Sequence, residues 1–302
     1  MQPLNSALSA TFEMKDLGEA EYLLGISIQR DRDRRTLSIN QGHYIREMLM
    51  EQRIPNSRRV TTPADGYTCL TQSTPGEPPT DIAAYQRLLG KLNWTVRGCR
   101  PDVGFATQKL SQFAHNPAVR HMVGAQRVLR YLGETEHAKI TFSKGELVGY
   151  TDADYAADES RKSTMGFVFM LGGGAITWSS KLQRSVSTST TEAEYHALSY
   201  ASKEAVWIAS FLQQIGRPVR GPVPVYSDNE GAIALVKNPE FHARTKHIDV
   251  SVHYVRELAE DGKVNIQHTP TESMLADCLT KPLKAVQHMR NMEGIGLWCH
   301  GI

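Results

Sequence analysis

The chain has 302 residues, of which 40% are hydrophobic and 22% are charged, and its formal net charge at pH 7 is +2. This composition is typical of a globular protein with room for two domains, and it excludes a disordered chain. No apolar run approaches the roughly 18 residues that span a membrane, and the N-terminus lacks a signal-peptide pattern, so the sequence predicts an intracellular protein. The four cysteines have no zinc-ligand spacing, which favours free thiols.

The charge is unevenly divided along the chain. Residues 1–146 contain 19 Lys and Arg against 15 Asp and Glu, whereas residues 147–302 contain 15 against 17. A basic first half would suit the phosphate backbone of a nucleic acid. An excess of this size is also ordinary for a segment of this length, so the charge alone does not decide.

The first half is predicted to begin with a β-hairpin and to continue with helices. Apolar runs at residues 22–29 and 36–39 flank a charged turn, which is the pattern of two paired strands. Apolar residues at helical spacing predict four helices, with proline at the start of the last two. These helices cover residues 43–52, 81–94, 102–113 and 118–132. Five prolines within residues 55–80 predict a long irregular crossing after the first helix.

In the second half, strands are predicted to alternate with helices. The strands cover residues 147–152, 165–171, 175–180, 222–226 and 264–267. The helices cover residues 190–215, 230–236, 245–260 and 272–279. This alternation implies an α/β layer structure. The change from a mainly helical to a strand-rich pattern at residues 140–147 predicts two domains, 1–146 and 147–302.

Four carboxylates of the second half occupy matching contexts. Asp152 and Asp228 each end an apolar strand, and Glu194 and Asp277 lie on predicted helices. A single aspartate at the end of a strand is more often a cap or turn residue. Four carboxylates that converge would carry too much like charge to be stable unless divalent cations neutralise them. The set therefore predicts a metal site.

Seven segments of the second half carry a resemblance to a known family. They include Tyr-Thr-Asp-Ala-Asp-Tyr at 150–155, Ser-Thr-Thr-Glu-Ala-Glu-Tyr at 189–195 and Leu-Ala-Asp-Cys-Leu-Thr-Lys-Pro at 275–282. The others are residues 161–169, 172–181, 227–229 and 244–249. Together with the order Asp, Glu, Asp, Asp, they resemble the copia-type retrotransposon form of ribonuclease H. The resemblance implies an α/β domain with a five-stranded mixed sheet that is flanked by helices on both faces.

The first half resembles the same family in residues 12–18, 85–92, 100–106 and 127–132. These segments resemble the part of a copia-type reverse transcriptase that follows its polymerase active site, which implies a mainly helical, thumb- and connection-like region with a β-hairpin. The family's polymerase motif contains two adjacent aspartates, and no Asp-Asp pair occurs in the sequence. The chain therefore resembles the C-terminal part of a Pol polyprotein, and DNA polymerase activity is not expected of it. Whether it belongs to an active element, a decayed copy or a domesticated gene stays open.

The resemblance implies a metal-dependent endonuclease that cleaves the RNA strand of RNA–DNA hybrids. Two Mg²⁺ or Mn²⁺ ions about 4 Å apart would activate the water and stabilise the leaving oxygen. Asp152 would contact both ions, Glu194 and Asp228 one of them, and Asp277 the other. His268 lies near the position where related nucleases carry a histidine that assists product release, and it completes the predicted catalytic set. The implied partners are the hybrid, whose 2′-hydroxyls mark the RNA strand, and the polymerase region of the polyprotein, in a cytoplasmic particle or the nucleus.

Two glutamates, Glu192 and Glu194, compete for the role of helical ligand. Residues two apart on a helix point about 200° apart, so only one can face the metals. Glu194 precedes Ala197 and Leu198, which belong to the stripe that is predicted to pack on the sheet. The sequence therefore predicts that Glu194 is the ligand and that Glu192 points outward.

Other residues and other functions stay open at this point. The candidate phosphate contacts are Arg127, Arg130, Lys181, Arg244 and Lys246, although solvated basic side chains are nearly as common. Trp178 is predicted to be a core residue. The chain could also be an inactive remnant that only binds nucleic acid, or a DNA nuclease of the same superfold such as a transposase or resolvase. The complete motif set argues against the DNA nuclease.

Overall fold

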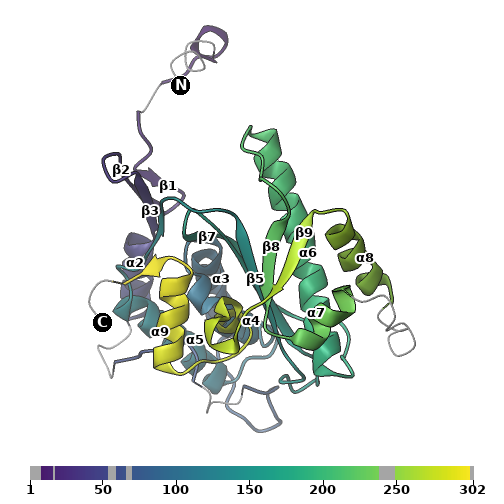
Figure 1. Cartoon of the computed structure of the whole chain (residues 1–302). Coiled ribbons are helices and arrows are strands. Elements are labelled where there is room, and N and C mark those ends of the chain that lie inside the picture. The colour runs from purple at the N-terminus through teal and green to yellow at the C-terminus, as the bar shows by residue number, and fades with distance from the viewer. Residues whose placement is uncertain (1–7, 16–17, 54–58, 66–69, 238–248, 300–302) are drawn as a thin grey trace.

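The computed structural model describes residues 8–15, 18–53, 59–65, 70–237 and 249–299, and its named strands form two sheets of five (Figure 1). The first sheet is antiparallel, with the order β1-β2-β3-β4-β10. Its strands are β1 Tyr22–Leu23, β2 Ile26–Asp31, β3 Thr36–Asn40, β4 Lys139–Phe142 and β10 Leu297–Trp298. The single strand predicted over residues 22–29 is wrong, because Leu24 and Gly25 have φ of 54° and 81° and form a tight turn between β1 and β2.

The helices predicted in the first half are confirmed, with shifted ends. They are α2 Gly42–Gln52, α3 Ile82–Gly98, α4 Gly104–Ser111 and α5 Val119–Glu134. The Asp81 side chain caps α3 by accepting a hydrogen bond from the backbone N–H of Ala84 (3.0 Å). A 3₁₀ turn, η1 Pro101–Val103, replaces the predicted first turn of the third helix.

The second sheet is mixed, with the order β7-β6-β5-β8-β9. Its strands are β5 Val148–Asp154, β6 Thr164–Leu171, β7 Gly174–Leu182, β8 Val223–Ser227 and β9 Val264–His268. β5 pairs antiparallel with β6 and parallel with β8. One face packs on α6 Thr190–Gln214, α7 Glu230–Lys237 and α8 Asp249–Glu260, and α4 and the 3₁₀ helix η5 Leu275–Leu279 pack on the other (Figure 1). The predicted five-stranded mixed sheet with helices on both faces is therefore confirmed.

The C-terminal segment differs from its prediction. Residues 272–279 do not form one α-helix, because Met274 is extended (φ −74°, ψ 100°) and separates the 3₁₀ helices η4 Thr271–Ser273 and η5. A further helix, α9 Ala285–Gly294, and strand β10 follow. The apolar pattern does not reveal α9, because its buried face carries the polar residues His288 and Asn291. β10 returns to pair with β4, so the end of the chain completes the first sheet.

One hydrophobic core joins the two halves of the chain. Buried residues from both sides of residue 147 contact one another in it, among them Leu88 and Leu129 from the first half and Val168, Leu279 and Met292 from the second. A separate core lies between the other face of the second sheet and α6, α7 and α8. The division into 1–146 and 147–302 stays a prediction, and the shared core makes the two segments interdependent in folding.

A buried polar network crosses this shared core. The Arg100 guanidinium donates two hydrogen bonds to the Asp102 carboxylate (2.9 and 2.7 Å), and it also donates to the carbonyl and hydroxyl oxygens of Thr135 (3.1 and 2.6 Å). The Tyr131 hydroxyl donates to Asp102 (2.8 Å) and therefore accepts from His288 Nε2 (2.9 Å). We call these five residues the Arg100 network. It ties α9 to η1 and α5.

The sequence predictions also concerned the cysteines and the apolar content of the helices. Cys99, Cys278 and Cys299 are free thiols, as predicted, and Cys69 lies outside the described residues. None of the helices in the described part of the chain has the length and apolar content to cross a membrane.

Candidate active site

The ends of β5 and β8 bring two of the predicted aspartates together. The two strands are parallel, with Gly149 opposite Val225 and Tyr150 opposite Tyr226. Parallel strands end at the same edge of a sheet, so Asp152 near the end of β5 lies beside Asp228, the first residue after β8. The Thr271 hydroxyl from η4 donates to Asp228 Oδ2 (2.8 Å) and fixes that carboxylate.

Small residues bring α6 close to this edge. Ala193 and Ala197 of α6 pack against Ala153 of β5, and this close contact places Glu194 beside the end of the strand. Glu192 does not point outward as predicted. It is buried, and its carboxylate accepts hydrogen bonds from the backbone N–H and the hydroxyl of Thr188 (2.6 and 2.7 Å). Glu192 therefore caps the start of α6, a role that leaves Glu194 as the glutamate that faces the strand ends.

A glycine on β6 brings η5 to the same place. Gly166 is opposite Asp152, and a Cβ on it would lie 2.8 Å from Leu279 Cβ and 3.1 Å from Thr280 Cγ2. Because Gly166 has no side chain, the end of η5 can rest on the sheet. The Thr280 hydroxyl then donates to Asp152 Oδ2, and Asp277 comes to lie at the same edge.

Three carboxylates converge within the described residues. Oxygen atoms of Asp152, Glu194 and Asp228 all lie within 4.8 Å of one another. The Lys281 ammonium is 2.9 Å from Asp277 Oδ1 and 3.5 Å from Asp152 Oδ2, so it links Asp277 to the other three. We call the four carboxylates the carboxylate cluster. Glu194 Oε2 is buried without a hydrogen-bond partner, which leaves this group of acids short of positive charge and of donors.

The shortage of positive charge in the carboxylate cluster shifts the pKa values of its members. Burial, and then the charges of Asp152 and Asp228, hold the pKa of Glu194 well above its ordinary value. Burial and Asp152 raise the pKa of Asp277 to about 7, although Lys281 opposes them. Burial would lower the pKa of Lys281, but the charges of Asp152 and Asp277 outweigh burial and raise it. A divalent cation would supply the missing charge, and carboxylate oxygens are the ligands that Mg²⁺ prefers.

The structure places the other predicted residues less centrally. His268 ends β9 opposite Ser227, next to Asp228 along the sheet, and is exposed. Lys181 is exposed, with its ammonium 5.4 Å from the centre of the Tyr200 ring. Trp178 is half-buried and donates to the carbonyl oxygen of Val96 (2.9 Å), as expected of a core residue. Two other predicted phosphate contacts, Arg127 and Arg130, lie on α5, and Arg244 and Lys246 lie outside the described residues.

Lys281 is the charged site residue that the sequence did not predict, and Thr271 and Thr280 were not predicted either. The signal for Lys281 was present, because residues four apart share a face of a helical turn and Lys281 follows Asp277 at that spacing. Lysines near acids are common on solvated surfaces, so the spacing alone does not separate this one from the others. Its side chain is 30% exposed, against 3% for Asp152.

No protein-family model matches the sequence. The chain is 40% identical over 286 residues to the retrovirus-related Pol polyprotein from transposon TNT 1-94 of Nicotiana tabacum, an alignment that covers 92% of this chain and 22% of that polyprotein. It is 37% identical over 294 residues to the retrovirus-related Pol polyprotein from transposon RE1 of Arabidopsis thaliana, with 96% of this chain and 20% of that polyprotein covered. This chain thus spans about a fifth of the length of either polyprotein.

Among solved structures, the chain is similar to the ribonuclease H1 of Halobacterium salinarum NRC-1. The sequences are 18% identical, the TM-score is 0.34, and the match covers 45% of this chain and 95% of that one.

Proposed function

Because the chain is 40% and 37% identical to retrovirus-related Pol polyproteins from transposons over 92% and 96% of its length, we propose that its carboxylate cluster is the active site of a ribonuclease H. The substrate is an RNA–DNA hybrid and the bond cleaved is a phosphodiester of the RNA strand. The reaction depends on Mg²⁺ or Mn²⁺.

The convergence of Asp152, Glu194 and Asp228 within 4.8 Å supports this function most directly. Three acids at one sheet edge repel one another, and a buried oxygen of Glu194 has no hydrogen-bond partner. Both features fit a cation site, since a divalent ion would bind the free oxygen and offset the repulsion. Asp152, Glu194 and Asp228 would hold one ion, and Asp277 with Asp152 would hold the second. When bound, such ions supply a water of lowered pKa and positive charge at the leaving oxygen.

The surrounding side chains orient the ligands. Thr280 and Thr271 donate hydrogen bonds to Asp152 and Asp228, so each carboxylate keeps an oxygen turned toward the site. Lys281 holds Asp277 against Asp152 and adds positive charge where the phosphate of the RNA strand would lie. His268, at the end of β9 opposite Ser227, would contact the product strand.

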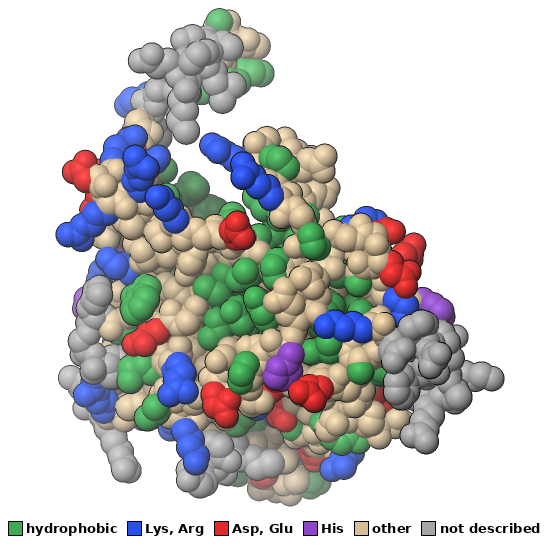
Figure 2. Space-filling view, in the orientation of Figure 1, with side chains coloured by type: hydrophobic (Ala, Val, Ile, Leu, Met, Phe, Trp, Pro, Cys, Tyr) green, Lys and Arg blue, Asp and Glu red, His purple; other side chains and the backbone are tan. Residues whose placement is uncertain are grey.

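The first half supplies basic surface for the hybrid. Figure 2 shows Lys and Arg side chains gathered over the β2–β3 hairpin, where Arg30, Arg34 and Arg35 are exposed. Arg127, which is predicted to contact phosphates, also lies 3.3 Å from the carboxylate of Asp65, and its contact with phosphate stays a prediction, as does that of Arg130. We assign further phosphate contacts of this half to the hairpin.

The decisive experiment incubates the purified full chain with a labelled RNA–DNA hybrid, a DNA duplex and an RNA duplex, with Mg²⁺ or with excess chelator. We expect cleavage of the RNA strand of the hybrid alone, and only with the metal. Cleavage that persists in chelator would overturn the metal-dependent mechanism, and cleavage of the DNA duplex would favour the DNA nuclease.

Metal binding provides a readout that does not depend on catalysis. We expect Mg²⁺ to raise the unfolding temperature of the wild-type chain, because a ligand that binds only the folded state stabilises it by about 2.7 kcal/mol at a concentration of 100 Kd. Asp228→Asn should reduce this shift and abolish cleavage while the chain still folds. A chain that binds the hybrid and the metal but never cleaves would be the inactive remnant.

A further inference from the structure

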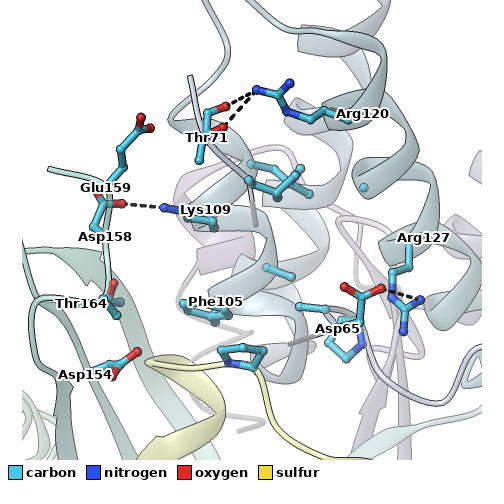
Figure 3. A pocket seen from close by; sticks show the side chains of 18 of the residues that line it. Asp65, Thr71, Phe105, Lys109, Arg120, Arg127, Asp154, Asp158, Glu159 and Thr164 are labelled. Carbon is cyan, nitrogen blue, oxygen red and sulfur yellow. Dashed lines mark hydrogen bonds and ion pairs between the residues drawn. The ribbon is translucent and has the colours of Figure 1, made fainter. Parts of the chain in front are cut away.

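A cavity of about 980 Å³ opens between the two halves of the chain (Figure 3). Its volume lies at the upper end of the range of small-ligand pockets, about 300–1,000 Å³. Helices α4 and α5 of the first half form one wall, and residues 154–164 of the second half form the other. Figure 3 shows Phe105 of α4 between Asp154 and Thr164 on one side and Asp65 and Arg127 on the other.

The Phe105 ring is available to a ligand. It is half-buried, yet it does not belong to the hydrophobic cores that the described residues form. It also makes no ring contact with another aromatic side chain among those residues. Ala106, Leu110 and Val123 also contribute apolar groups to the lining of this cavity. A flat apolar group could therefore stack on this ring inside the cavity.

The loop between β5 and β6 forms the opposite wall in a strained conformation. Ala156 and Arg161, neither of them glycine, have φ of 51° and 62°. Asp158 holds the loop, because its carboxylate accepts from the backbone N–H and hydroxyl of Ser160 (2.9 and 2.7 Å) and its carbonyl accepts from Arg161 N (2.8 Å). Strain held in place by such contacts is typical of ligand-binding loops.

Arg161 is a cation of the cavity lining that is available to a ligand. Lys109 pairs across the cavity with Asp158 (2.6 Å), Arg127 pairs with Asp65, and Arg120 pairs with Glu77. The Arg161 side chain is exposed and takes part in no ion pair with the described residues. A phosphate at the mouth of the cavity would meet this guanidinium.

The cavity begins one nucleotide step from the carboxylate cluster. Asp154, which lines it, is two residues beyond Asp152 on the same face of β5, about 6.6 Å along the strand. Pro282, also in the lining, follows Lys281 directly. A strand with a phosphate at the cluster would therefore place its neighbouring nucleotide at the mouth of the cavity.

We propose that this cavity binds one unpaired nucleotide of the substrate strand, with its base stacked on Phe105 and its phosphate at Arg161. Because this strand is the one that the carboxylate cluster would cleave, the inference rests on the proposed function. The site favours hybrids with an unpaired or displaced nucleotide beside the scissile bond over fully paired hybrids. Bases stack on aromatic side chains with little regard to sequence, so the preference applies to all four bases.

Two measurements test the site on the full chain carrying Asp228→Asn, which prevents cleavage. The first is photocross-linking of a hybrid that carries one unpaired 5-iodouridine, with the cross-linked residue identified by mass spectrometry. The second is the affinity of this hybrid relative to a fully paired one. We expect a cross-link at Phe105 and about tenfold tighter binding of the hybrid with the unpaired nucleotide.

Variants at Phe105 separate stacking from packing. Phe105→Leu keeps an apolar side chain and should remove both the cross-link and the preference, whereas Phe105→Tyr should retain them. Phe211→Leu is the matched control, because Phe211 is an exposed aromatic on α6 outside the cavity lining, and it should change neither readout. A cross-link elsewhere, or equal affinity for the two hybrids, would overturn the inference.

Arg161→Gly tests the phosphate contact without disturbing the loop, since glycine adopts the positive φ of this position freely. We expect weaker binding of the hybrid with the unpaired nucleotide and a salt-dependence slope reduced by about 1. An unchanged slope would remove Arg161 from the site. If the wild-type chain cleaves the hybrid but no cross-link forms at Phe105, the nucleotide site is rejected and the proposed function stands. If the cross-link forms but the wild-type chain does not cleave, the nucleotide site stands and the proposed function is rejected.

Discussion

The carboxylate cluster and the Arg100 network are both buried groups of charged side chains near the junction of the two halves, and they are built in opposite ways. In the Arg100 network, Asp102 accepts from the Arg100 guanidinium and from Tyr131, and Arg100 also donates to Thr135. The carboxylate cluster has four acids, one lysine and a buried glutamate oxygen with no partner. Burial therefore does not by itself separate a structural site from a functional one.

The balance between acids, positive charges and hydrogen-bond donors distinguishes the structural site from the functional one. Arg100 outweighs the effect of burial on Asp102 and lowers the pKa of that carboxyl, so the pair is ionised and satisfied in the folded chain. In the carboxylate cluster the pKa of Glu194 and Asp277 is raised, because burial and neighbouring acids act in the same direction. A buried group that lacks counter-charge is suited to bind a cation from solution, whereas a balanced group is suited to hold elements together.

The largest effect is expected for Glu194→Gln, which should lose cleavage activity without losing stability. The change removes a ligand from the cluster and should lower the cleavage rate by about 10³-fold or more, since metal ions contribute several kcal/mol to such reactions. It should leave the metal-free chain as stable as the wild type or more stable, because it also removes like-charge repulsion. Hybrid cleavage and urea unfolding in chelator measure the two effects. A variant that unfolds would place Glu194 in the same class as Arg100.

The opposite result is expected for Arg100→Met. Removal of the guanidinium leaves Asp102 buried without its counter-charge, which should lower the free energy of unfolding by about 3–5 kcal/mol. Arg97→Met on the exposed surface of α3 is the control and should change it by less than about 0.5 kcal/mol. Urea unfolding at one pH compares the two variants. Equal small effects would mean that the network does not stabilise the junction.

The two groups should respond to pH in opposite directions within the same range. The folded pKa of Asp277 is raised from 3.8 to about 7, so its contribution to stability is present at low pH and is lost as pH rises toward 7. Burial lowers the pKa of His288 from 6.5 to about 4, so its contribution is present above pH 6.5 and is lost as pH falls toward 4. For each group, the free energy of unfolding changes by at most about 1.4 kcal/mol per pH unit.

Single variants should reveal the two slopes, which partly cancel in the metal-free wild type. Asp277→Asn should remove the loss at rising pH, and His288→Gln should remove the loss at falling pH. Unfolding free energies between pH 4 and 8 in chelator provide the measurement. If both variants keep the wild-type profile, neither group controls the pH dependence.

The smallest effect is expected for Glu192→Gln. Glu192 is buried like Glu194, but it is satisfied by Thr188 at the start of α6. Loss of its charge should lower the free energy of unfolding by about 0.5–1 kcal/mol and leave cleavage near the wild-type rate. Comparison with Glu194→Gln in the same assays checks the assignment. A loss of activity in Glu192→Gln alone would reverse the roles of the two glutamates.

Local patterns were enough to predict much of the fold and four of the candidate site residues. An apolar strand that ends in an aspartate is visible in the sequence, and the parallel pairing of β5 and β8 then places Asp152 beside Asp228. The spacing between Glu194 and the sheet-facing stripe of α6 correctly predicted which glutamate faces the strand ends. The strand ending and the helical spacing depend on residues within one or two turns of each other, so periodicity reports them, whereas the pairing of β5 with β8 joins distant segments.

Contacts between distant segments were beyond the reach of such patterns. Tyr131 and His288 are 157 residues apart in the chain, and Tyr131 is the hydrogen-bond partner that satisfies the buried His288 of α9. Glu192 was predicted to point outward because it lies about 200° from Glu194 around the helix, whereas its cap to Thr188 allows it to be buried. The role of Lys281 depends on the approach of η5 to Gly166, a fit between two surfaces that no sequence period records. The sequence by itself determined which residues carry charge and which faces of the helices and strands are apolar. The tertiary structure decided which of the buried charges are paired and which remain free to bind a cation. Pairing depends on distances between segments that only folding brings together.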